Sequence, residues 1–346
     1  MTDRKAGYFI PCAILTNVEI SNLLQELAMH PLSIIVAPGP WDPEPWRNEF
    51  QAAAEGRPVH IWPQDGSAIG DESYVICAWK SDPKVFDRYS DPKAVFSLGA
   101  GVDHLHVLRS RPDIPVVRVI DPDLTMRMVE YVAFAVLYLH RKIPLYQAAQ
   151  ARRAWRPMHQ PAATRVRVGI MGVGVLGEAC GKLLTQLGFE VAGWARSRRD
   201  VSPFQVFSGQ DSLGSFLERT EILVNLLPNT PETAGLIGRE VFKRLNRNGR
   251  LGNAFFVNAG RGETVVESEL IDMLSTGTLA GAVLDVFNVE PLPEESPLWA
   301  MENVLVTPHV AADSDPEVIV AQILRDVKRL ERGEGPLNVV DMSRGY

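Results

Sequence analysis

The chain has 346 residues, of which 46% are hydrophobic and 22% charged, and its formal net charge at pH 7 is −7. This composition is ordinary for a globular protein, and the length exceeds what one core usually supports, so two domains are expected. The acidic balance disfavours general binding to nucleic acid or to an anionic membrane.

The cysteines and the lengths of the apolar runs indicate where in the cell the protein is expected. The three cysteines are widely spaced and form no C-x-x-C pair, so neither a disulfide framework nor a thiolate metal site is indicated. No run of about 18 apolar residues exists, and the N-terminus lacks the charged-then-apolar pattern of a signal peptide. We therefore expect a cytoplasmic protein that neither spans a membrane nor is secreted.

The first part of the chain alternates strand-sized apolar runs with turn-rich or helix-capable segments. This alternation predicts a small α/β unit over about residues 31–120, preceded by an N-terminal extension, 1–30, whose role stays open. A long pattern over 126–151, apolar on one face, predicts one helix that crosses to a second unit. The predicted strands of the first unit are 33–37, 59–62, 74–78 and 94–98.

A second α/β unit is predicted from about residue 165 to residue 307, because strand-like runs there alternate with helical patterns. An amphipathic pattern over 316–332 then predicts a last helix that packs back on the first unit. The predicted strands of the second unit are 166–171, 190–195, 222–227, 255–258, 280–287 and 304–307. Its predicted helices are 178–187, 211–219, 241–245 and 267–275.

Chemically capable groups follow each strand of the second unit. In an open parallel sheet, ligands bind beyond the carboxyl ends of the strands, so these groups are expected to form one site. In chain order they are a glycine-rich loop at 172–177, basic residues at 196–198, the segment 228–230, Arg261, Glu290 and His309.

The glycine-rich loop has the sequence Gly172-Val173-Gly174-Val175-Leu176-Gly177, which matches the G-x-G-x-x-G pattern. A match alone is weak, but here an apolar strand precedes it, a helical pattern follows, and a second strand comes about twenty residues later. The glycines allow a tight turn, close approach of a pyrophosphate and close packing of helix on strand. A dinucleotide site is therefore predicted.

The residues at the end of the second strand indicate whether the dinucleotide is NAD or NADP. NAD sites usually carry an acid there, which binds the ribose hydroxyls, whereas this chain has Arg196, Ser197 and Arg198. Guanidinium and hydroxyl groups would bind a 2′-phosphate with charge-assisted hydrogen bonds. NADPH is therefore the predicted cofactor, with NAD as a possible second one and a solvated basic turn as the alternative interpretation.

Arg261, Glu290 and His309 each have an ordinary explanation when taken singly, as a turn, a cap and a structural histidine. At the ends of adjacent strands, however, they can together reduce a 2-keto acid. Arg261 would bind the carboxylate and polarise the carbonyl, and His309 would donate a proton. Glu290 would keep the histidine protonated by opposing its charge.

The motifs that contain these residues resemble the D-isomer-specific 2-hydroxyacid dehydrogenase family in order and spacing, over most of the chain from about residue 33. They are the segments 172–177, 258–262, 284–291 and 307–309. Within the family the resemblance is strongest to the glyoxylate/hydroxypyruvate reductase A branch. That likeness rests on the segments 97–103, 169–172, 225–230, 291–299 and 344–346.

The resemblance implies a flavodoxin-like substrate-binding domain, 31–120 plus 312–346, beside a Rossmann NAD(P)-binding domain, 121–311, which includes the linker helix. It also implies a homodimer and the reduction of glyoxylate or hydroxypyruvate with NADPH to glycolate or D-glycerate. The substrate carboxylate would be held by backbone N–H groups around Ala100 and Gly101, which suits a glycine-rich turn.

Further roles come from the same resemblance. Asp285 and the carbonyl of Ala259 would hold the nicotinamide carboxamide, and Leu227 and Pro228 would pack near the ring. Trp155 lies in a segment that in this family meets the partner subunit, where the indole can reach the partner's substrate pocket. Simple packing is the alternative for Trp155.

Several features depart from the family or compete with it. The segment 246–254 is several residues longer than the family norm, which would put Arg261 in doubt if it shifts the following strand. The pair His104 and His106 resembles metal ligands, but without a clear third ligand we expect no metal. A formate dehydrogenase of the same fold and a non-catalytic dinucleotide sensor are the rival functions.

Overall fold

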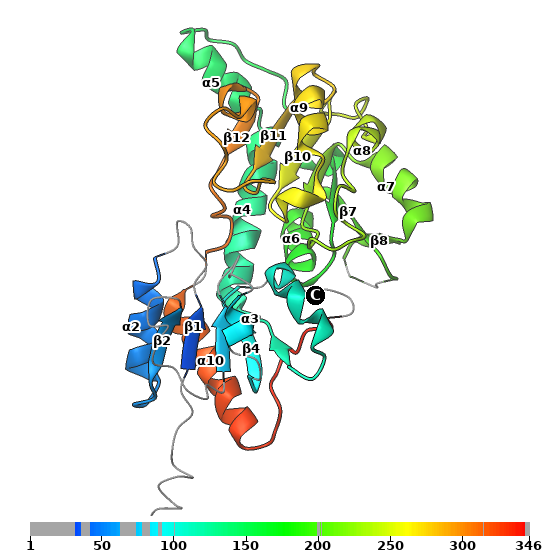
Figure 1. Ribbon diagram of the computed structural model, residues 1–346. Coiled ribbons are helices and arrows are strands. Elements are labelled where there is room, and N and C mark those ends of the chain that lie inside the picture. Colours follow the sequence, from blue (N-terminus) through cyan, green and yellow to red (C-terminus); the bar gives the residue numbers. More distant parts are fainter. Residues whose placement is uncertain are drawn as a thin grey trace, which may run out of the picture.

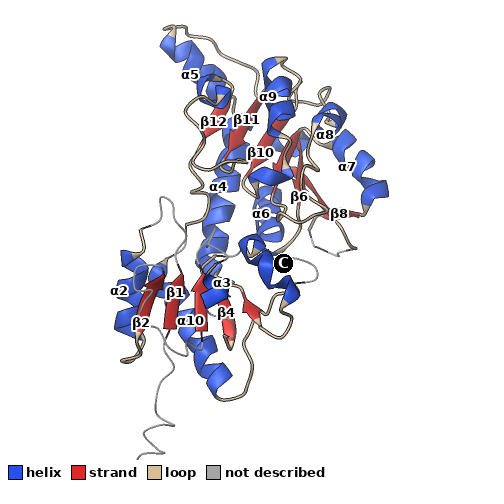
Figure 2. Ribbon diagram, in the orientation of Figure 1, coloured by secondary structure: helices blue, strands red, loops and turns tan. Residues whose placement is uncertain are grey.

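The computed structural model describes residues 32–35, 42–62, 74–77, 84–88, 92–99, 101–198, 201, 203–313 and 315–342. Two parallel sheets, each flanked by helices, lie at opposite ends of the molecule (Figures 1 and 2). The predicted α/β class is thereby confirmed. The N-terminal extension 1–30 and the terminal segment 344–346 lie outside the described residues.

The first sheet has the strand order β2-β1-β3-β4-β5, and all its recorded pairs are parallel. This is the 2-1-3-4-5 order of flavodoxin-like folds. The sequence predicts four of the strands but not β5, which is too short to produce a periodic pattern. The bounds are β1 Leu32–Ile35, β2 Val59–Trp62, β3 Tyr74–Cys77, β4 Ala94–Ser97 and β5 Val116–Val117; α2 Glu44–Ala53, α3 Val85–Arg88 and the 3-10 helix η1 Asp103–Ser110 accompany them.

The second sheet has the order β12-β11-β10-β9-β6-β7-β8, again with parallel pairs. Counted from β6, the order is 3-2-1-4-5-6 with a seventh strand at one edge, which is the Rossmann arrangement. The strands are β6 Arg167–Met171, β7 Glu190–Ala195, β8 Gln205–Ser208, β9 Ile222–Asn225, β10 Phe255–Asn258, β11 Gly281–Leu284 and β12 Val304–Val306. The helices are α6 Val175–Gln186, α7 Leu213–Arg219, α8 Arg239–Arg244 and α9 Glu267–Ser275.

Three sequence-based expectations about these strands were incomplete. The edge strand β8 was not predicted, because its side chains are only partly buried and show no alternation. The predicted strands 222–227 and 280–287 both run past the observed ends at Asn225 and Leu284. There the apolar run continues into a loop that leaves the sheet to form the site.

The prediction of one helix over 126–151 is wrong. The helix α4 begins earlier, at Pro122, because the Asp121 carboxylate accepts hydrogen bonds from the N–H groups of Asp123 and Leu124. It ends at His140, and α5 Ile143–Ala151 follows as a separate helix. Pro144 causes the break, since it has no N–H to donate to the His140 carbonyl; the side-chain amide of Gln160 donates to that carbonyl instead.

The last helix, α10 Pro316–Glu331, packs on the first sheet and not on the second, as the sequence predicts. Its apolar face, with Ile319 and Ile323, shares a buried cluster with Trp46 and Phe50 of α2. Arg57, in the loop after α2, and Glu331 of α10 add a two-pronged ion pair, with distances of 2.7 and 2.8 Å. The chain therefore enters the second unit once and returns once.

The long segment 246–254 does not displace the strand that follows it. Glu221 is buried beneath it, and its carboxylate accepts hydrogen bonds from the N–H groups of Arg167 and Leu251. The strand β10 stays in register with β9, Phe255 facing Ile222. In the described part of the chain, no helix combines the length and apolarity that crossing a membrane would require.

Candidate active site

The topology brings the post-strand loops of the second sheet together. The strands β6 and β9 are neighbours although they are not consecutive, so the glycine-rich loop and the loop after β9 flank the point where the strand order reverses. In doubly wound sheets this point is where ligands bind. The loops after β10, β11 and β12 continue along the same edge.

The three glycines of the loop have three different surroundings. Gly172 has a φ of +95°, and a Cβ there would lie 2.6 Å from the Leu226 carbonyl oxygen. A Cβ on Gly177 would lie 2.0 Å from the Gly172 carbonyl oxygen, so helix and turn touch there. Gly174 instead faces open space and precedes α6, whose first turn receives no side-chain cap. Unpaired N–H groups beside open space fit a pyrophosphate.

The basic segment at the end of β7 is accessible. Arg196, Ser197 and Arg198 are all exposed. Nearby, in the loop after β9, the pKa of Glu232 is lowered by a hydrogen bond with the Thr230 side chain, and the positive charges of Arg196 and Arg109 contribute. The charge of Arg196 therefore reaches the loop on the other side of the switch point, and no acid stands at the end of β7.

His309 and Glu290 form a close pair. The Nδ1 of His309 lies 2.9 Å from Oε2 of Glu290, while Oε1 of Glu290 accepts a hydrogen bond from the N–H of Phe287. The glutamate side chain is 11% exposed and the histidine side chain 33%, so the ring keeps an accessible edge. The contact with Glu290 engages Nδ1, one of the two ring nitrogens.

The loop that presents His309 is fixed by Asp285 at the end of β11. Asp285 is 1% exposed, and its carboxylate accepts from the Thr307 hydroxyl and from the N–H groups of Val310 and Ala311. The Asp285 backbone carbonyl accepts from the N–H of His309, whose φ is +56°. Asp285 therefore holds the loop that carries His309 in place. Its contact with the nicotinamide carboxamide stays a prediction.

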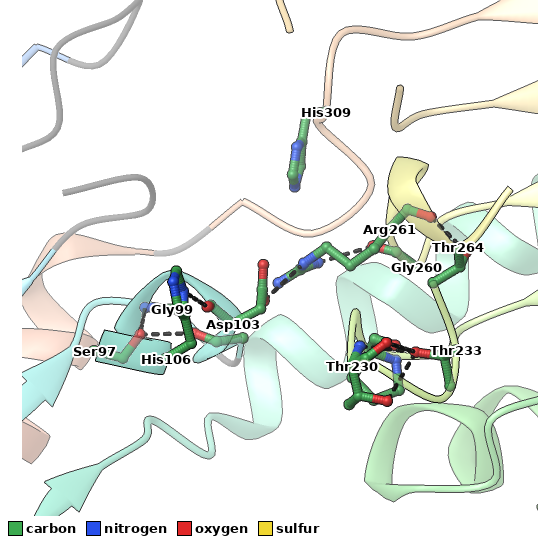
Figure 3. A network of polar contacts seen from close by, with 12 residues as sticks. Ser97, Gly99, Asp103, His106, Thr230, Thr233, Gly260, Arg261, Thr264 and His309 are labelled. Carbon is green, nitrogen blue, oxygen red and sulfur yellow. Dashed lines mark hydrogen bonds and ion pairs between the residues drawn. The ribbon is translucent and has the colours of Figure 1, made fainter. Parts of the chain in front are cut away.

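Arg261 reaches from the second unit to the first. Its Nε donates to Oδ1 of Asp103 at 3.0 Å, and its Nη1 donates to the Gly260 carbonyl at 2.8 Å. The guanidinium also lies directly on Gly101, since a Cβ built there would be 1.7 Å from Nη2. Figure 3 shows the His309 ring directed towards this Arg261–Asp103 pair. A carboxylate and a carbonyl could thus meet the guanidinium and the imidazole in one place.

Burial and neighbouring charges determine the pKa values of Asp103 and His104. Burial by itself would raise the pKa of the Asp103 carboxyl, but the Arg261 charge and hydrogen bonds with the backbone and the guanidinium hold it below its ordinary value. His104, the next residue, has both ring nitrogens buried without a hydrogen-bond partner, and burial lowers its pKa to about 4. We expect His104 to be neutral at pH 7.

The comparisons with known proteins agree with this geometry. Residues 133–311 match the family described as D-isomer specific 2-hydroxyacid dehydrogenase, NAD binding domain. A glyoxylate/hydroxypyruvate reductase A from Klebsiella pneumoniae is 40% identical over 307 residues, which are 87% of this chain and 96% of the relative. The chain belongs to the D-isomer-specific 2-hydroxyacid dehydrogenase family.

Solved structures of this dehydrogenase family are also similar. One is an NADPH-dependent glyoxylate/hydroxypyruvate reductase from Sinorhizobium meliloti in complex with NADP and sulfate, with 40% identity, a TM-score of 0.86 and coverage of 92% of this chain and 100% of that one. Another, from Xanthobacter autotrophicus Py2 in complex with NADPH and MES, has 40% identity, a TM-score of 0.83 and the same coverage. The chain is therefore an NAD(P)-dependent oxidoreductase that acts on CH–OH groups.

The structure says less about the other residues predicted for the dehydrogenase site. Ala100 lies outside the described residues, although Gly101 beside it contacts Arg261. Trp155 is 99% exposed and follows α5, which lies at the end of the molecule remote from the first unit (Figure 1). Leu227, Pro228 and Ala259 lie in the loops after β9 and β10, and their contact with a nicotinamide stays a prediction.

The sequence analysis missed a buried polar network that supports these loops. Asn225 and Asn258 face each other in register at the ends of β9 and β10, and the Asn225 amide donates to Asn258 and to Thr264. The side-chain Oδ1 of Asn225 accepts from the N–H of Leu227, and the Thr264 hydroxyl donates to the Arg261 backbone carbonyl at 2.6 Å. An asparagine ending each of two adjacent apolar strands was the available signal.

Proposed function

We propose that this chain reduces glyoxylate or hydroxypyruvate with NADPH, forming glycolate or D-glycerate. The observation that carries the proposal is the His309–Glu290 pair, 2.9 Å apart, beside an arginine that bridges the two units. Relatives of similar length named glyoxylate/hydroxypyruvate reductase A support the substrate class. The NADP and NADPH complexes of solved relatives support the cofactor.

The chain's own residues fit a dinucleotide. The open space at Gly174 and the uncapped N–H groups of α6 suit its pyrophosphate. Arg196, Ser197 and Arg198 suit a 2′-phosphate, because each offers a hydrogen-bond donor and two carry positive charge. Leu227, Pro228, Ala259 and Asp285 are proposed to surround the nicotinamide.

The proposed reaction divides the work between cofactor and protein. When bound, NADPH supplies the hydride that is added to the carbonyl carbon. Arg261 binds the substrate carboxylate together with N–H groups near Gly101, and its positive charge polarises the carbonyl. Nε2 of His309 donates a proton to the carbonyl oxygen, which becomes the hydroxyl. Glu290 stabilises the imidazolium before transfer by accepting its Nδ1 proton in a hydrogen bond.

The proposed roles of the residues also suggest which parts of the chain form each domain. Residues 31–120 with 312–346 are proposed as the substrate-binding domain, and 121–311 as the NAD(P)-binding domain. The return of α10 to α2 supports assigning the C-terminal part to the first domain. Substrate would then bind where Gly101 and Asp103 of one domain meet Arg261 of the other.

A homodimer is proposed as the functional form. Several large apolar side chains are exposed on α4, on α5 and just beyond them, including Phe134 at 50%, Leu145 at 56% and Trp155 at 99%. Patches of this kind mark protein interfaces. Trp155 would then reach the substrate pocket of the partner. Size-exclusion chromatography with light scattering tests the proposal, and a monomer at micromolar concentration would refute it.

A substrate panel tests the function. NADPH oxidation would be followed with glyoxylate, hydroxypyruvate, pyruvate and phenylpyruvate, and repeated with NADH. We expect the highest kcat/KM with glyoxylate or hydroxypyruvate and NADPH. Preference for a larger keto acid would indicate a dehydrogenase of different substrate, and NADPH binding without turnover of any keto acid would favour a dinucleotide sensor. A cytoplasmic location is part of the same proposal.

A further inference from the structure

Arg261 is oriented by a residue of the opposite unit. The Nε of Arg261 and Oδ1 of Asp103 are 3.0 Å apart, although the residues are 158 positions apart in the sequence. Their side chains are 18% and 15% exposed, so water screens this ion pair only partly. Asp103 begins η1, immediately after the turn that contains Gly101.

That turn is itself held in place. The Ser97 hydroxyl donates to the Gly101 carbonyl at 2.8 Å and accepts from the N–H of Gly99. Gly101 lies against the Arg261 guanidinium. The Asp103 carboxylate accepts a hydrogen bond from Nε of the same group (Figure 3). One short segment therefore both contacts the arginine and determines its direction.

Two of the guanidinium N–H donors of Arg261 are bound within the protein, and the others lie along one edge that can bind a ligand. Arginine has five N–H donors in a fixed fork. Nε is taken by Asp103, and one Nη1 donor is taken by the Gly260 carbonyl. The remaining donors belong to Nη1 and Nη2, the two atoms of the edge that binds a carboxylate with two parallel hydrogen bonds. A guanidinium released from Asp103 would rotate and lose this alignment.

We propose that Asp103 is a positioning residue for substrate binding, which acts by holding the Arg261 guanidinium of the opposite unit with its Nη edge presented to the substrate carboxylate. The proposal rests on the proposed function of Arg261 as the carboxylate anchor. Asp103 itself contacts no substrate. Its contribution is geometric, because it accepts a hydrogen bond at one place, and both the length and the acceptor oxygen of the side chain matter.

Three substitutions at Asp103 separate geometry from charge. Asp103→Ala removes the acceptor and should raise KM for the keto acid about 10- to 100-fold, the usual worth of a charged hydrogen bond, with kcat less affected. Asp103→Asn keeps the acceptor without the charge and should stay within about threefold of the wild type. Asp103→Glu keeps the charge but displaces the acceptor, so its KM should rise. Asp113→Ala, an exposed acid just beyond η1, is the matched control.

The binding of oxalate, measured by calorimetry in the presence of NADP, is the second readout. Oxalate presents a carboxylate beside a second carbonyl and cannot be reduced, so it reports on the anchor even if no keto acid is turned over. Inactivity of the wild type with every keto acid would thus refute the proposed function while leaving Asp103 testable. The expected loss of oxalate affinity is limited to the Ala and Glu variants, and NADPH affinity should be unchanged.

A double-mutant cycle identifies the route of the effect. If Asp103 acts through Arg261, Asp103→Ala should cost little further oxalate affinity in an Arg261→Ala background. Full, independent losses from the two substitutions would overturn the proposal, as would an unchanged KM in Asp103→Ala. Should the Ala variant fail to fold, the contrast between Asn and Glu decides: an impaired Asn variant with an active Glu variant would show that charge, not geometry, is required.

Discussion

The Glu290 carboxylate joins two parts of the site: it accepts from the N–H of Phe287 with one oxygen and meets Nδ1 of His309 at 2.9 Å with the other. The first contact fixes the direction of the carboxylate, and the second fixes the ring. In the proposed mechanism His309 is the general acid and transfers the proton from Nε2. Its orientation would then depend on Glu290.

The first prediction concerns this pair. His309→Ala should lower kcat by about 10²–10⁴-fold, the range for a positioned general acid, with little change in NADPH affinity. Glu290→Gln should also lower kcat, because an amide cannot make the same charged hydrogen bond with the ring. Steady-state kinetics from pH 5 to 9 would check both variants. Turnover near that of the wild type in His309→Ala would refute the mechanism.

The second prediction concerns Arg261, which donates to Asp103, to Gly260 and, as proposed, to the substrate. Arg261→Lys should lower kcat/KM about 10²-fold or more, because an ammonium is a point charge that cannot make the same two-pronged contact. Kinetics with glyoxylate are the measurement. Lys243→Arg, a substitution at an exposed residue of α8, is the control for effects of substitution on expression and folding. Equal activity of the Lys variant would mean that charge alone suffices.

The third prediction concerns cofactor choice. Changing Arg196 and Arg198 together to Ala should weaken NADPH binding by about 10- to 150-fold for each hydrogen-bonded arginine, and NADH binding should hardly change. Adding Ala195→Asp should turn the preference towards NADH, because a carboxylate at this place accepts from the ribose hydroxyls and repels a phosphate. Fluorescence titrations with both nucleotides test this. A wild type that uses NADH as well as NADPH contradicts it.

The fourth prediction compares substitutions at Gly174 and Gly177, two glycines of the same loop, so that each serves as the control for the other. Gly174→Ala adds a methyl group into open space, so thermal stability should be kept while NADPH affinity falls, because the methyl group occupies the path of the pyrophosphate. Gly177→Ala forces a Cβ to within 2.0 Å of the Gly172 carbonyl oxygen, so stability should fall, by about 1–3 kcal/mol. Calorimetry and nucleotide titration separate the two. Equal losses of stability would contradict the assignment.

The fifth prediction concerns acid stability and His104, whose pKa is lowered by burial to about 4. Because the folded pKa lies below the unfolded value of about 6.5, its contribution to stability is complete above pH 6.5 and is lost as the pH falls towards 4. His104→Leu should therefore lose less stability in this window, by up to about 1.4 kcal/mol per pH unit. Urea unfolding at pH 7.0 and 4.5 measures the difference. Parallel losses in the two proteins would mean that His104 has the same pKa in the folded and the unfolded state.

Most of the second unit can be predicted from the sequence, because its strands are apolar runs that end at glycines or chemically capable residues. The glycine loop at Gly172 and the order of Arg261, Glu290 and His309 belong to this predictable part. Their spacing along the chain reflects one strand–loop period each, so strand placement alone brings them to a common edge. Their individual roles stay predictions.

The remainder depends on contacts that leave no periodic signal. Asp103 and Arg261 meet across two units, and their neighbours in the sequence do not indicate it. The break between α4 and α5 depends on Pro144 and is stabilised by Gln160, which lies 20 positions beyond the carbonyl that it serves. The anchoring of 246–254 by Glu221 is equally non-local. Buried polar residues, more than apolar patterns, account for what sequence reasoning did not find.

The return of α10 to α2 means that the protein cannot be divided into its two units by a single cut. A fragment ending near residue 120 would lack Ile319 and Ile323 and would expose the faces of Trp46 and Phe50 that these side chains cover. A fragment beginning there would end in a helix whose apolar face has nothing to cover it. The second unit can be isolated only by removing sequence from both of its ends, and the first only by joining β5 to α10 with a new linker.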